Sequence, residues 1–404
     1  MPADAILETP SRTELEPRLA RLRAGLEAAG LDAALLVESA DLYHLAGTVQ
    51  NAQLVVPVAG DPLLLVRRDL ERARAESALD DVEPLTSLRA LEPALVRLGL
   101  GPGSAIGLEL DVLPAATYLR YAALLPDRRL GDAMPAVWAA RAAKSPWELD
   151  RVRAACAQSA AALEALPALV RVGRAEADVL SDLASVMRAH GHEGTIRFRG
   201  LNGEFWFGQV LAGPLAAVPG PRDTPLSGTG LSPAQGSGPS RRPLAAGDAV
   251  VVDVSGLAGG YVSDQTRTVF LGEPDPRLVS AHETCRAILR ACEELLVPGT
   301  AASAVYDRGL EVAAEAGLED HYMGFGSARV RFVGHAIGLE LNEPPALARG
   351  VEAPLVEGAV VAVEPKLVFP GLGAVGIENS YVVRAGGPER LTPADGDLAV
   401  LVEA

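Results

Sequence analysis

The chain has 404 residues, of which 52 are acidic and 36 basic, giving a formal net charge of −16. This length suggests two or three domains and is ample for a large core. The acidic balance and the lack of any basic run argue against nucleic acid or an anionic membrane surface as partners.

Three further features bear on location. The N-terminal segment MPADAILETPSRTELEPR has no apolar region of the kind found in secretory signals, and no stretch approaches 18 unbroken apolar residues. The three cysteines have no metal-site spacing and suit a reducing compartment. We therefore expect a cytoplasmic protein without a membrane partner.

Residues 1–143 are predicted to form a compact α/β domain. Leucines at helical spacing predict a helix over 13–29, with Gly30 just past its end. Gly60-Asp61 suits a hairpin turn, and four apolar stretches are typical of strands: 33–39, 53–59, 62–68 and 104–110.

A second domain is predicted over residues 144–404, opened by a long helix over 144–166. Ser145 is a suitable N-cap and Pro146 suits the first helical position. Another helix is predicted over 175–190, before a stretch rich in Gly, Pro and Ser at 212–243. That stretch is too long for a simple connection, so it is either a functional loop, such as a lid over a site, or locally disordered.

Strands predominate in the remainder of the second domain. Helices are predicted over 276–296 and 301–316, and strands near 248–254, 260–270, 329–341, 359–368 and 375–384.

Two pairs of acids lie on these predicted strands. Asp253 ends a valine-rich strand, and Asp264 follows eleven residues later on the next strand after a glycine-rich turn. Glu364 and Glu378 repeat the pattern at a separation of fourteen residues. Each acid by itself can be an ordinary turn or edge residue, but a carboxylate at the end of an apolar strand is expected to be buried and to need partners.

His335 stands alone among glycines and aliphatic residues in GHAIGLELNEPP. Such a histidine is often a hydrogen-bonded core residue. Whether His335 is instead a metal ligand depends on whether acidic residues from elsewhere in the chain lie beside it. Four carboxylates and one imidazole in apolar surroundings need cations to neutralise them. The donor types suit two divalent ions such as Mn, Co, Fe or Zn, which can together activate water and polarise a carbonyl.

The stretches VVVD, SDQTRT, VGHAIGLELNEPP, AVEPKLVFPG and VGIEN resemble successive motifs of the creatinase/methionine aminopeptidase superfamily. The likeness is greatest to its Xaa-Pro peptidase branch, prolidase and aminopeptidase P. It implies an α+β protein, with a pita-bread catalytic domain over 144–404 after a creatinase-type N-terminal domain over 1–143. It also implies short peptide substrates, two metal ions (Mn, Co or Zn) and a homodimer.

The resemblance implies a role for each matching residue. Asp253 would bind one metal ion, Asp264 and Glu378 would bridge the pair, and His335 and Glu364 would bind the other. Glu364 would also carry the proton of a metal-bridged hydroxide. Thr266 matches a position close to the metals, and Arg267 is expected to be a structural ion-pair partner.

Three positions depart from the pattern of that branch. Its members typically carry a second histidine seven residues after the ligand histidine, where this chain has Asn342. They also carry one about seventeen residues before the first ligand aspartate, where this chain has Gly236, and an Arg often stands where this chain has Gly376. The chain is thus an atypical member that lacks both usual catalytic histidines, although Asn342 can still donate one neutral hydrogen bond.

The segment 188–209 can supply hydrogen-bond donors in place of the two missing histidines. It contains His192, Arg197, Arg199 and Glu204, which are candidate substrate-binding residues, with an arginine gripping a substrate carboxylate. The alternative is a solvated helix end followed by an edge strand.

Three functions remain open from the sequence. The leading hypothesis is a dinuclear metallopeptidase acting on short peptides, as a dipeptidase, an aminopeptidase or a carboxypeptidase-like enzyme with an anchor near 197–199. The second is non-peptidase hydrolase or lyase chemistry on the same fold. The third is a non-catalytic binding protein, against which the retention of all five ligand types argues.

Overall fold

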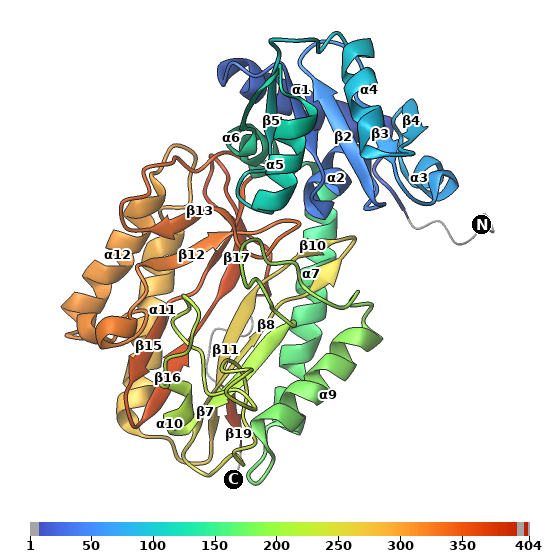
Figure 1. Cartoon of the computed structure of the whole chain (residues 1–404). Helices are drawn as coiled ribbons and strands as arrows, with labels where there is room; N and C mark the ends of the chain where they lie inside the picture. The colour runs from blue at the N-terminus through green and yellow to red at the C-terminus, as the bar shows by residue number, and fades with distance from the viewer. Residues whose placement is uncertain (1–7, 394–399, 403–404) are drawn as a thin grey trace. The chain divides into compact units, whose positions relative to one another are not determined.

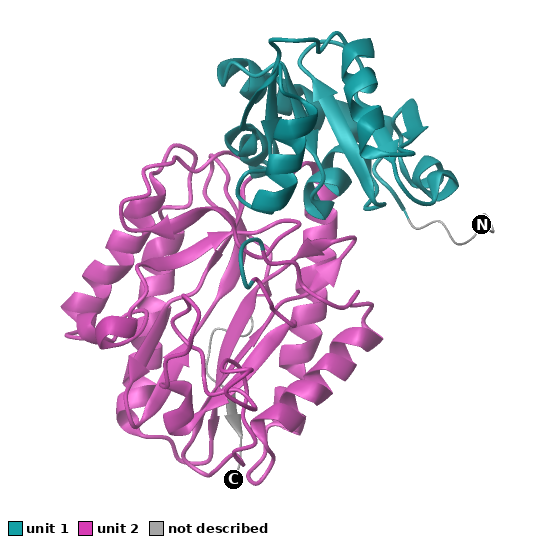
Figure 2. Ribbon diagram, in the orientation of Figure 1, with its two compact units in different colours: residues 1–143, 199–202 teal, residues 144–198, 203–404 magenta. Residues whose placement is uncertain are grey.

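The computed structural model describes residues 8–393 and 400–402 and divides the chain into two compact units. Unit 1 comprises residues 1–143 and 199–202, and unit 2 comprises residues 144–198 and 203–404 (Figure 2). Residues 1–7, which begin the N-terminal segment considered above, lie outside the described part. Among the described residues, none of the helices combines the length and apolarity needed to cross a bilayer.

Unit 1 is built on one mixed six-stranded sheet with the order β4-β3-β2-β1-β5-β6 (Figure 1). The β1-β2-β3 neighbours are antiparallel, and the other pairs are parallel. The strands are β1 (Ala33–Leu36), β2 (Ala52–Pro57), β3 (Leu63–Val66), β4 (Asp81–Pro84), β5 (Ala105–Leu108) and β6 (Arg129–Asp132). The helices are α1 (Arg12–Ala28), α2 (Ser39–Ala46), α3 (Leu70–Glu76), α4 (Leu91–Arg97), α5 (Ala115–Leu124) and α6 (Met134–Ala142).

Successive residues of the strands in unit 1 pack into two different cores. Ala34 and Leu36 of β1 belong to the same cluster as the leucines of α1, whereas Ala33 and Leu35 belong to the cluster on the opposite face. Side chains alternate across a strand, so continuous apolar runs such as these are expected where both faces are covered. The predicted helix over 13–29 and the four predicted strands are confirmed, although the strand predicted over 33–39 is shorter than expected, because β1 ends at Leu36 and α2 begins at Ser39. The partly exposed strands β4 and β6 were not predicted, because they lack such apolar runs.

Unit 2 opens with α7 (Pro146–Glu164), as predicted. The Ser145 side chain accepts a hydrogen bond from the backbone N–H of Glu148, and the Glu148 carboxylate accepts one from the backbone of Ser145. This reciprocal capping satisfies two backbone donors at the start of the helix. The short α8 (Leu166–Leu169) follows, and α9 (Glu176–Ala189) confirms the helix predicted over 175–190.

Two larger sheets form the centre of unit 2, with orders β19-β11-β8-β7 and β13-β12-β14-β17-β18. In Figure 1, α11 and α12 lie on one side of these sheets, and α7 and α9 lie on the other. The strands of unit 2 are β7 (Gly208–Ala212), β8 (Ala249–Val254), β9 (Leu257–Ala258), β10 (Tyr261–Val262), β11 (Gln265–Leu271), β12 (Phe332–Ala336), β13 (Glu343–Ala348), β14 (Val360–Val363), β15 (Lys366–Phe369), β16 (Gly373–Gly376), β17 (Asn379–Val382), β18 (Glu389–Arg390) and β19 (Val400–Val402). Its other helices are α10 (Gly213–Ala216), α11 (Pro276–Glu293) and α12 (Ala302–Glu315).

The predictions of single strands over 359–368 and 375–384 are wrong, since each segment forms two strands. β14 and β17 pair with each other in the five-stranded sheet, whereas β15 and β16 pair as a separate two-stranded ribbon. The first break falls at Glu364-Pro365, where proline has no N–H to continue a ladder, and the second falls at Ile377-Glu378. Both glutamates of the predicted site therefore lie where the chain passes between sheets.

The predicted strand over 260–270 is divided in the same way between β10 and β11, with Asp264 in the gap. The strand predicted over 329–341 is shorter than expected, because β12 ends at Ala336.

The glycine- and proline-rich stretch 212–243 is held at both ends by one carboxylate. The two oxygens of Glu176 accept hydrogen bonds from the backbone N–H of Ala212 at 2.9 Å and of Ser240 at 2.7 Å. Between these points, Leu226 is buried against Leu211 and Val251. The stretch is thus an anchored loop, and its role as a lid stays a prediction.

Candidate metal centre

The hairpin of β8 and β11 supplies the two aspartates. Thr266 of β11 pairs directly with Asp253 of β8, and Asp264 lies immediately before β11. The carboxylate of Asp264 accepts a hydrogen bond from Ser255 Oγ at 3.0 Å, and its backbone N–H and C=O both bond to Ser380 Oγ. Both aspartates are buried, so the hairpin brings two carboxylates out of water.

The five-stranded sheet supplies the histidine and the two glutamates. His335 of β12 pairs with Ala362 of β14, and Glu364 follows β14 directly. Glu378 precedes β17, and its backbone N–H donates to the carbonyl of Thr266 at 3.1 Å. This bond ties the two sheets together at the point where their acidic residues meet.

Three of these residues place donor atoms close together. One donor atom from each of Asp264, His335 and Glu378 lies within 4.8 Å of the other two. His335 Nε2 is 3.8 Å from Asp264 Oδ2 and 3.6 Å from Glu364 Oε1, and its Nδ1 lies 3.2 Å from the carbonyl of Ala336. Asp264, His335, Glu364 and Glu378 therefore converge on one place. Asp253 lies beside them, because its Oδ2 is 3.4 Å from Lys366 Nζ, which also contacts Glu364 and Glu378.

The hydrogen bonds at this centre do not neutralise the negative charge of its buried carboxylates. Burial raises the pKa of Asp264 well above its usual value, and the neighbouring carboxylates, Glu378 first, raise it further. Burial also raises the pKa of Glu378 to about 8, against the lowering effect of Lys366. Glu378 Oε1 is buried and has no hydrogen-bond partner among the described residues. A buried carboxylate oxygen without a partner fits a metal ligand.

Lys366 lies inside the centre and was not predicted to be there. Its Nζ donates a hydrogen bond to Glu364 Oε2 and lies 3.3 Å from Glu378 Oε2 and 3.4 Å from Asp253 Oδ2. The side chain is 1% exposed. Burial by itself would lower the pKa of Lys366, yet Glu364, Glu378 and Asp253 together raise it well above its usual value.

The residues predicted to act near the metals take distinct positions. Thr266 Oγ1 donates to Glu378 Oε2 at 2.6 Å, so it orients that carboxylate. Arg267 donates to the backbone carbonyl of Glu378 and to Asn379 Oδ1, at 2.8 and 3.0 Å. Asn342 is half-buried and directly precedes β13.

Two of the four candidate substrate-binding residues are engaged elsewhere. The backbone N–H of Gly194 donates to His192 Nδ1, so Nε2 carries the proton and donates to the carbonyl of Ser255 at 3.1 Å. Arg199 is grouped with unit 1, where its guanidinium pairs with Asp111 at 2.6 Å and Asp41 at 3.0 Å. Both side chains are buried, which argues against direct contact with substrate.

The other two candidates remain accessible. Glu204 is exposed and Arg197 is half-buried. The carbonyl of Arg197 accepts a hydrogen bond from the backbone N–H of Leu341 at 2.9 Å, which places this part of the segment beside the residue that precedes Asn342.

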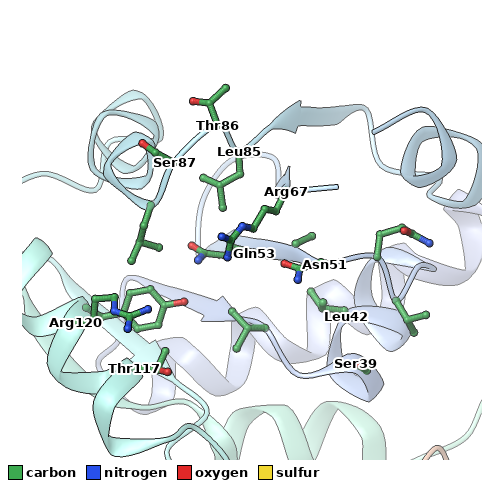
Figure 3. Close-up of a pocket in the computed structure, with 16 residues that line it drawn as sticks. Ser39, Leu42, Asn51, Gln53, Arg67, Leu85, Thr86, Ser87, Thr117 and Arg120 are labelled. Atoms are coloured by element: carbon green, nitrogen blue, oxygen red, sulfur yellow. The ribbon is translucent and has the colours of Figure 1, made fainter. Parts of the chain in front are cut away.

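Unit 1 contains a cavity of about 700 Å³, whose lining differs from that of the carboxylate centre in unit 2 (Figure 3). Arg67, Arg120, Asn51 and Gln53 contribute polar side chains to it. None of its lining residues is Asp, Glu, His or Cys, so it offers neither a metal donor set nor a carboxylate or imidazole base. The carboxylate centre of unit 2 is therefore the candidate site for hydrolytic chemistry.

Comparison with protein families agrees with this choice. The model of metallopeptidase family M24 matches residues 150–385, which include all five predicted ligands. The chain belongs to metallopeptidase family M24. The model of the creatinase/prolidase N-terminal domain matches residues 18–143. This M24 protein therefore combines a creatinase-type N-terminal domain with a pita-bread domain in an α+β fold.

Relatives of this M24 protein include peptidases that match it along nearly their whole length. The probable dipeptidase PepE of Mycobacterium tuberculosis (strain CDC 1551 / Oshkosh) is 30% identical over 95% of this chain and 96% of its own. The Xaa-Pro dipeptidase of Pyrococcus furiosus is 23% identical over 95% of this chain and 100% of its own.

Solved structures show the same fold. Dipeptidase PepE from Mycobacterium ulcerans is 28% identical, with a TM-score of 0.80 over 97% of this chain and 99% of that one. The Xaa-Pro dipeptidase from Bacillus anthracis has a TM-score of 0.81 at 22% identity, covering 96% and 99% of the two chains, which supports the fold. The M24 protein is thus a metallopeptidase related to dipeptidases.

Proposed function

We propose that this M24 protein hydrolyses dipeptides and other short peptides, Xaa-Pro dipeptides among them, with the help of a divalent ion. The observation that carries the proposal is the convergence of Asp264, His335 and Glu378, with Glu378 Oε1 left without a hydrogen-bond partner among the described residues. The full-length likeness to a dipeptidase at 30% identity supports the substrate class.

Asp264, His335 and Glu378 would hold the ion. Carboxylate and imidazole donors suit Mn, Co or Zn. When bound, such an ion supplies a Lewis acid that polarises the scissile carbonyl and lowers the pKa of water. The resemblance implies one ion at Asp253 and the other at His335 and Glu364. The contacts of the Lys366 ammonium group with Asp253, Glu364 and Glu378 argue against the ion at Asp253.

Glu364 is the proposed proton carrier. Its Oε2 accepts a hydrogen bond from Lys366, while Oε1 faces His335 at 3.6 Å. A carboxylate there can take a proton from the attacking water and pass it to the nitrogen of the leaving amine, which balances the hydrolysis of one amide bond. Thr266 is a positioning residue for Glu378, and Asn342 is the proposed neutral donor to the developing oxyanion.

Substrate recognition is assigned to the accessible part of the segment 188–209. Arg197 and Glu204 remain candidates for contacts with the charged ends of a short peptide. A free-amine anchor would make the enzyme a dipeptidase or aminopeptidase, whereas a carboxylate anchor at Arg197 would make it carboxypeptidase-like. With His192 and Arg199 already partnered, Arg197 is the arginine favoured for such an anchor.

The test is a hydrolysis screen of the purified full chain loaded with Mn, Co or Zn. Substrates are Xaa-Pro dipeptides, dipeptides without proline, longer peptides with a free amine and N-blocked peptides. We expect hydrolysis of at least one dipeptide class, and a loss of about 10²–10⁴-fold in kcat for Glu364→Gln, the range expected for a general acid–base group. Glu352→Gln, an exposed change outside the centre, is the control. No hydrolysis by any loaded wild-type sample would refute the proposal.

We also propose a cytoplasmic homodimer. The three cysteines are buried and free, which suits a reducing compartment. Sedimentation of the purified chain at several concentrations tests the dimer, and cell fractionation tests the location.

A further inference from the structure

The ammonium group of Lys366 occupies the part of the centre that borders Asp253 and Glu364. Its Nζ contacts Glu364 Oε2, Glu378 Oε2 and Asp253 Oδ2, all three of which belong to predicted metal ligands. The donor group of Asp264, His335 and Glu378 lies on the other part. Glu378 belongs to both, with Oε2 near the lysine and Oε1 without a hydrogen-bond partner among the described residues.

The local backbone is arranged to hold this lysine. Lys366 of β15 pairs with Gly376 of β16, and a Cβ built at Gly376 would lie 2.6 Å from Lys366 Cγ. Such a separation is too short for two carbons, so only glycine at 376 leaves room for the lysine stem in this position. The backbone of Lys366 is fixed as well, because its carbonyl accepts a hydrogen bond from the N–H of Met323 at 2.9 Å.

The choice of lysine also stands out within the chain. Only two of the 36 basic residues are lysines, Lys144 and Lys366, and the other 34 are arginines. Lysine carries a compact point charge, whereas the guanidinium of arginine is a planar fork of several donors. A compact cation resembles a metal ion in size and charge centre more closely than a guanidinium does.

A divalent ion bound by Asp253 would compete directly with the ammonium group, whose Nζ lies 3.4 Å from Asp253 Oδ2. Metal–oxygen bonds to carboxylates are about 2.0–2.2 Å long for zinc, so such an ion would lie within a few ångströms of Nζ. Two cations that close repel each other strongly in a buried site. Four carboxylates, one ammonium and one divalent ion carry a net charge of −1, whereas a second ion would reverse its sign.

We propose that the ammonium group of Lys366 takes the place of one of two metal ions, so that each chain binds a single divalent ion through Asp264, His335 and Glu378. Glu378 then bridges an ion and an ammonium group. The inference rests on the proposed metal-dependent function, but it concerns the number of ions and not the substrate.

The experiment counts metal ions in the full chain. The protein is stripped with chelator, loaded with excess Mn²⁺, freed of unbound metal by gel filtration and analysed by elemental mass spectrometry and electron paramagnetic resonance. We expect one Mn²⁺ per chain in the wild type, with the spectrum of an isolated ion. Lys366→Ala should raise the count to two and introduce spin coupling, because it removes the charge and opens space. Lys144→Ala, which alters the other buried lysine, should leave the count at one.

The outcomes separate this inference from the proposed function. Two ions in the wild type, or a single ion in folded Lys366→Ala, would overturn the role of Lys366 and leave the peptidase proposal standing. A wild type that binds no ion would overturn both. One bound ion without hydrolysis of any peptide would support the inference while refuting the proposed activity. The wild-type count is decisive even if Lys366→Ala does not fold.

Discussion

The two lysines of this chain lie in contrasting surroundings within unit 2. Lys144 Nζ lies 3.0 Å from Glu343 Oε2, and Glu343 Oε1 accepts a hydrogen bond from the backbone N–H of Leu339 at 2.8 Å. Lys366 instead contacts three carboxylates, and its charge also acts on a fourth, that of Asp264. Both lysine side chains are buried almost completely.

The difference is one of charge balance. A pair such as Lys144 and Glu343 neutralises itself, so it needs no further cation and its removal is expected to affect folding first. The surroundings of Lys366 keep a surplus of negative charge after the lysine is counted, and that surplus can attract and hold a divalent ion. Burial of a lysine therefore does not by itself distinguish a structural pair from a functional centre.

The largest effect is expected from removal of His335, the nitrogen ligand of the functional centre. For His335→Ala we expect weaker metal binding and a loss of activity of more than about 10³-fold, because the ion contributes several kcal/mol to catalysis. Metal content and kcat/KM are the measurements. His321→Ala changes a half-buried histidine whose Nδ1 lies 2.7 Å from the carbonyl of Val368, and should keep its metal. Full activity in His335→Ala would contradict the ligand assignment.

Removing Lys144 should show how much the buried pair of Lys144 and Glu343 stabilises the fold. Lys144→Met leaves Glu343 as a buried charge without its lysine, which is expected to lower the free energy of unfolding by about 3–5 kcal/mol. Denaturant unfolding measures this change. Arg308→Met removes an exposed pair with Glu311 and should cost less than about 1 kcal/mol. Equal effects for the two variants would mean that burial of the pair does not matter.

A smaller effect is expected from the hydroxyl that supports Asp264. Ser255→Ala removes the hydrogen bond to Asp264 Oδ1 and should weaken metal binding about 10- to 100-fold, as loss of a partner of a metal ligand commonly does. Isothermal titration with Mn²⁺ gives the affinity. Ser303→Ala, which removes a bond from a serine of α12 to Glu352, is the matched control and should leave the affinity unchanged.

The smallest predicted effect is a pH dependence that comes from His192. Burial lowers the pKa of His192 below its usual value, so its contribution to stability is present above the unfolded pKa of about 6.5 and is lost as pH falls through the folded pKa. His192→Gln should therefore lose less stability than the wild type between pH 7 and pH 5. Thermal unfolding across this range is the measurement, with His190→Gln as an exposed control. Parallel curves for wild type and His192→Gln would rule out this contribution.

Much of this arrangement follows from local patterns in the sequence. The apolar periodicity of α1 and the capping residues of α7 predict those helices, because the determinants lie within a few residues of each other. Acids at the ends of apolar strands likewise indicate a shared site, since a buried carboxylate needs partners wherever it lies.

Other features depend on tertiary pairing and could not be predicted. The division of 359–368 into β14 and β15 depends on which strand each half pairs with, although Pro365 is a visible signal for a break. The position of Lys366 could not be predicted for the same reason. The scarcity of lysine in the chain is a usable signal, but only the contacts of Lys366 Nζ with Glu364, Glu378 and Asp253 show that the side chain points into the carboxylates.

The steric exclusion between positions 366 and 376 has a consequence for how such a centre can change over time. A side chain larger than hydrogen at 376 would collide with the lysine stem, and loss of the lysine would leave its carboxylates without their ammonium partner. Position 376 can therefore not be exchanged while Lys366 stays, whereas Lys366 can be exchanged while Gly376 stays if a second metal ion takes the place of the ammonium group. A residue larger than glycine at 376 is thus a sequence marker of a centre without the ammonium group.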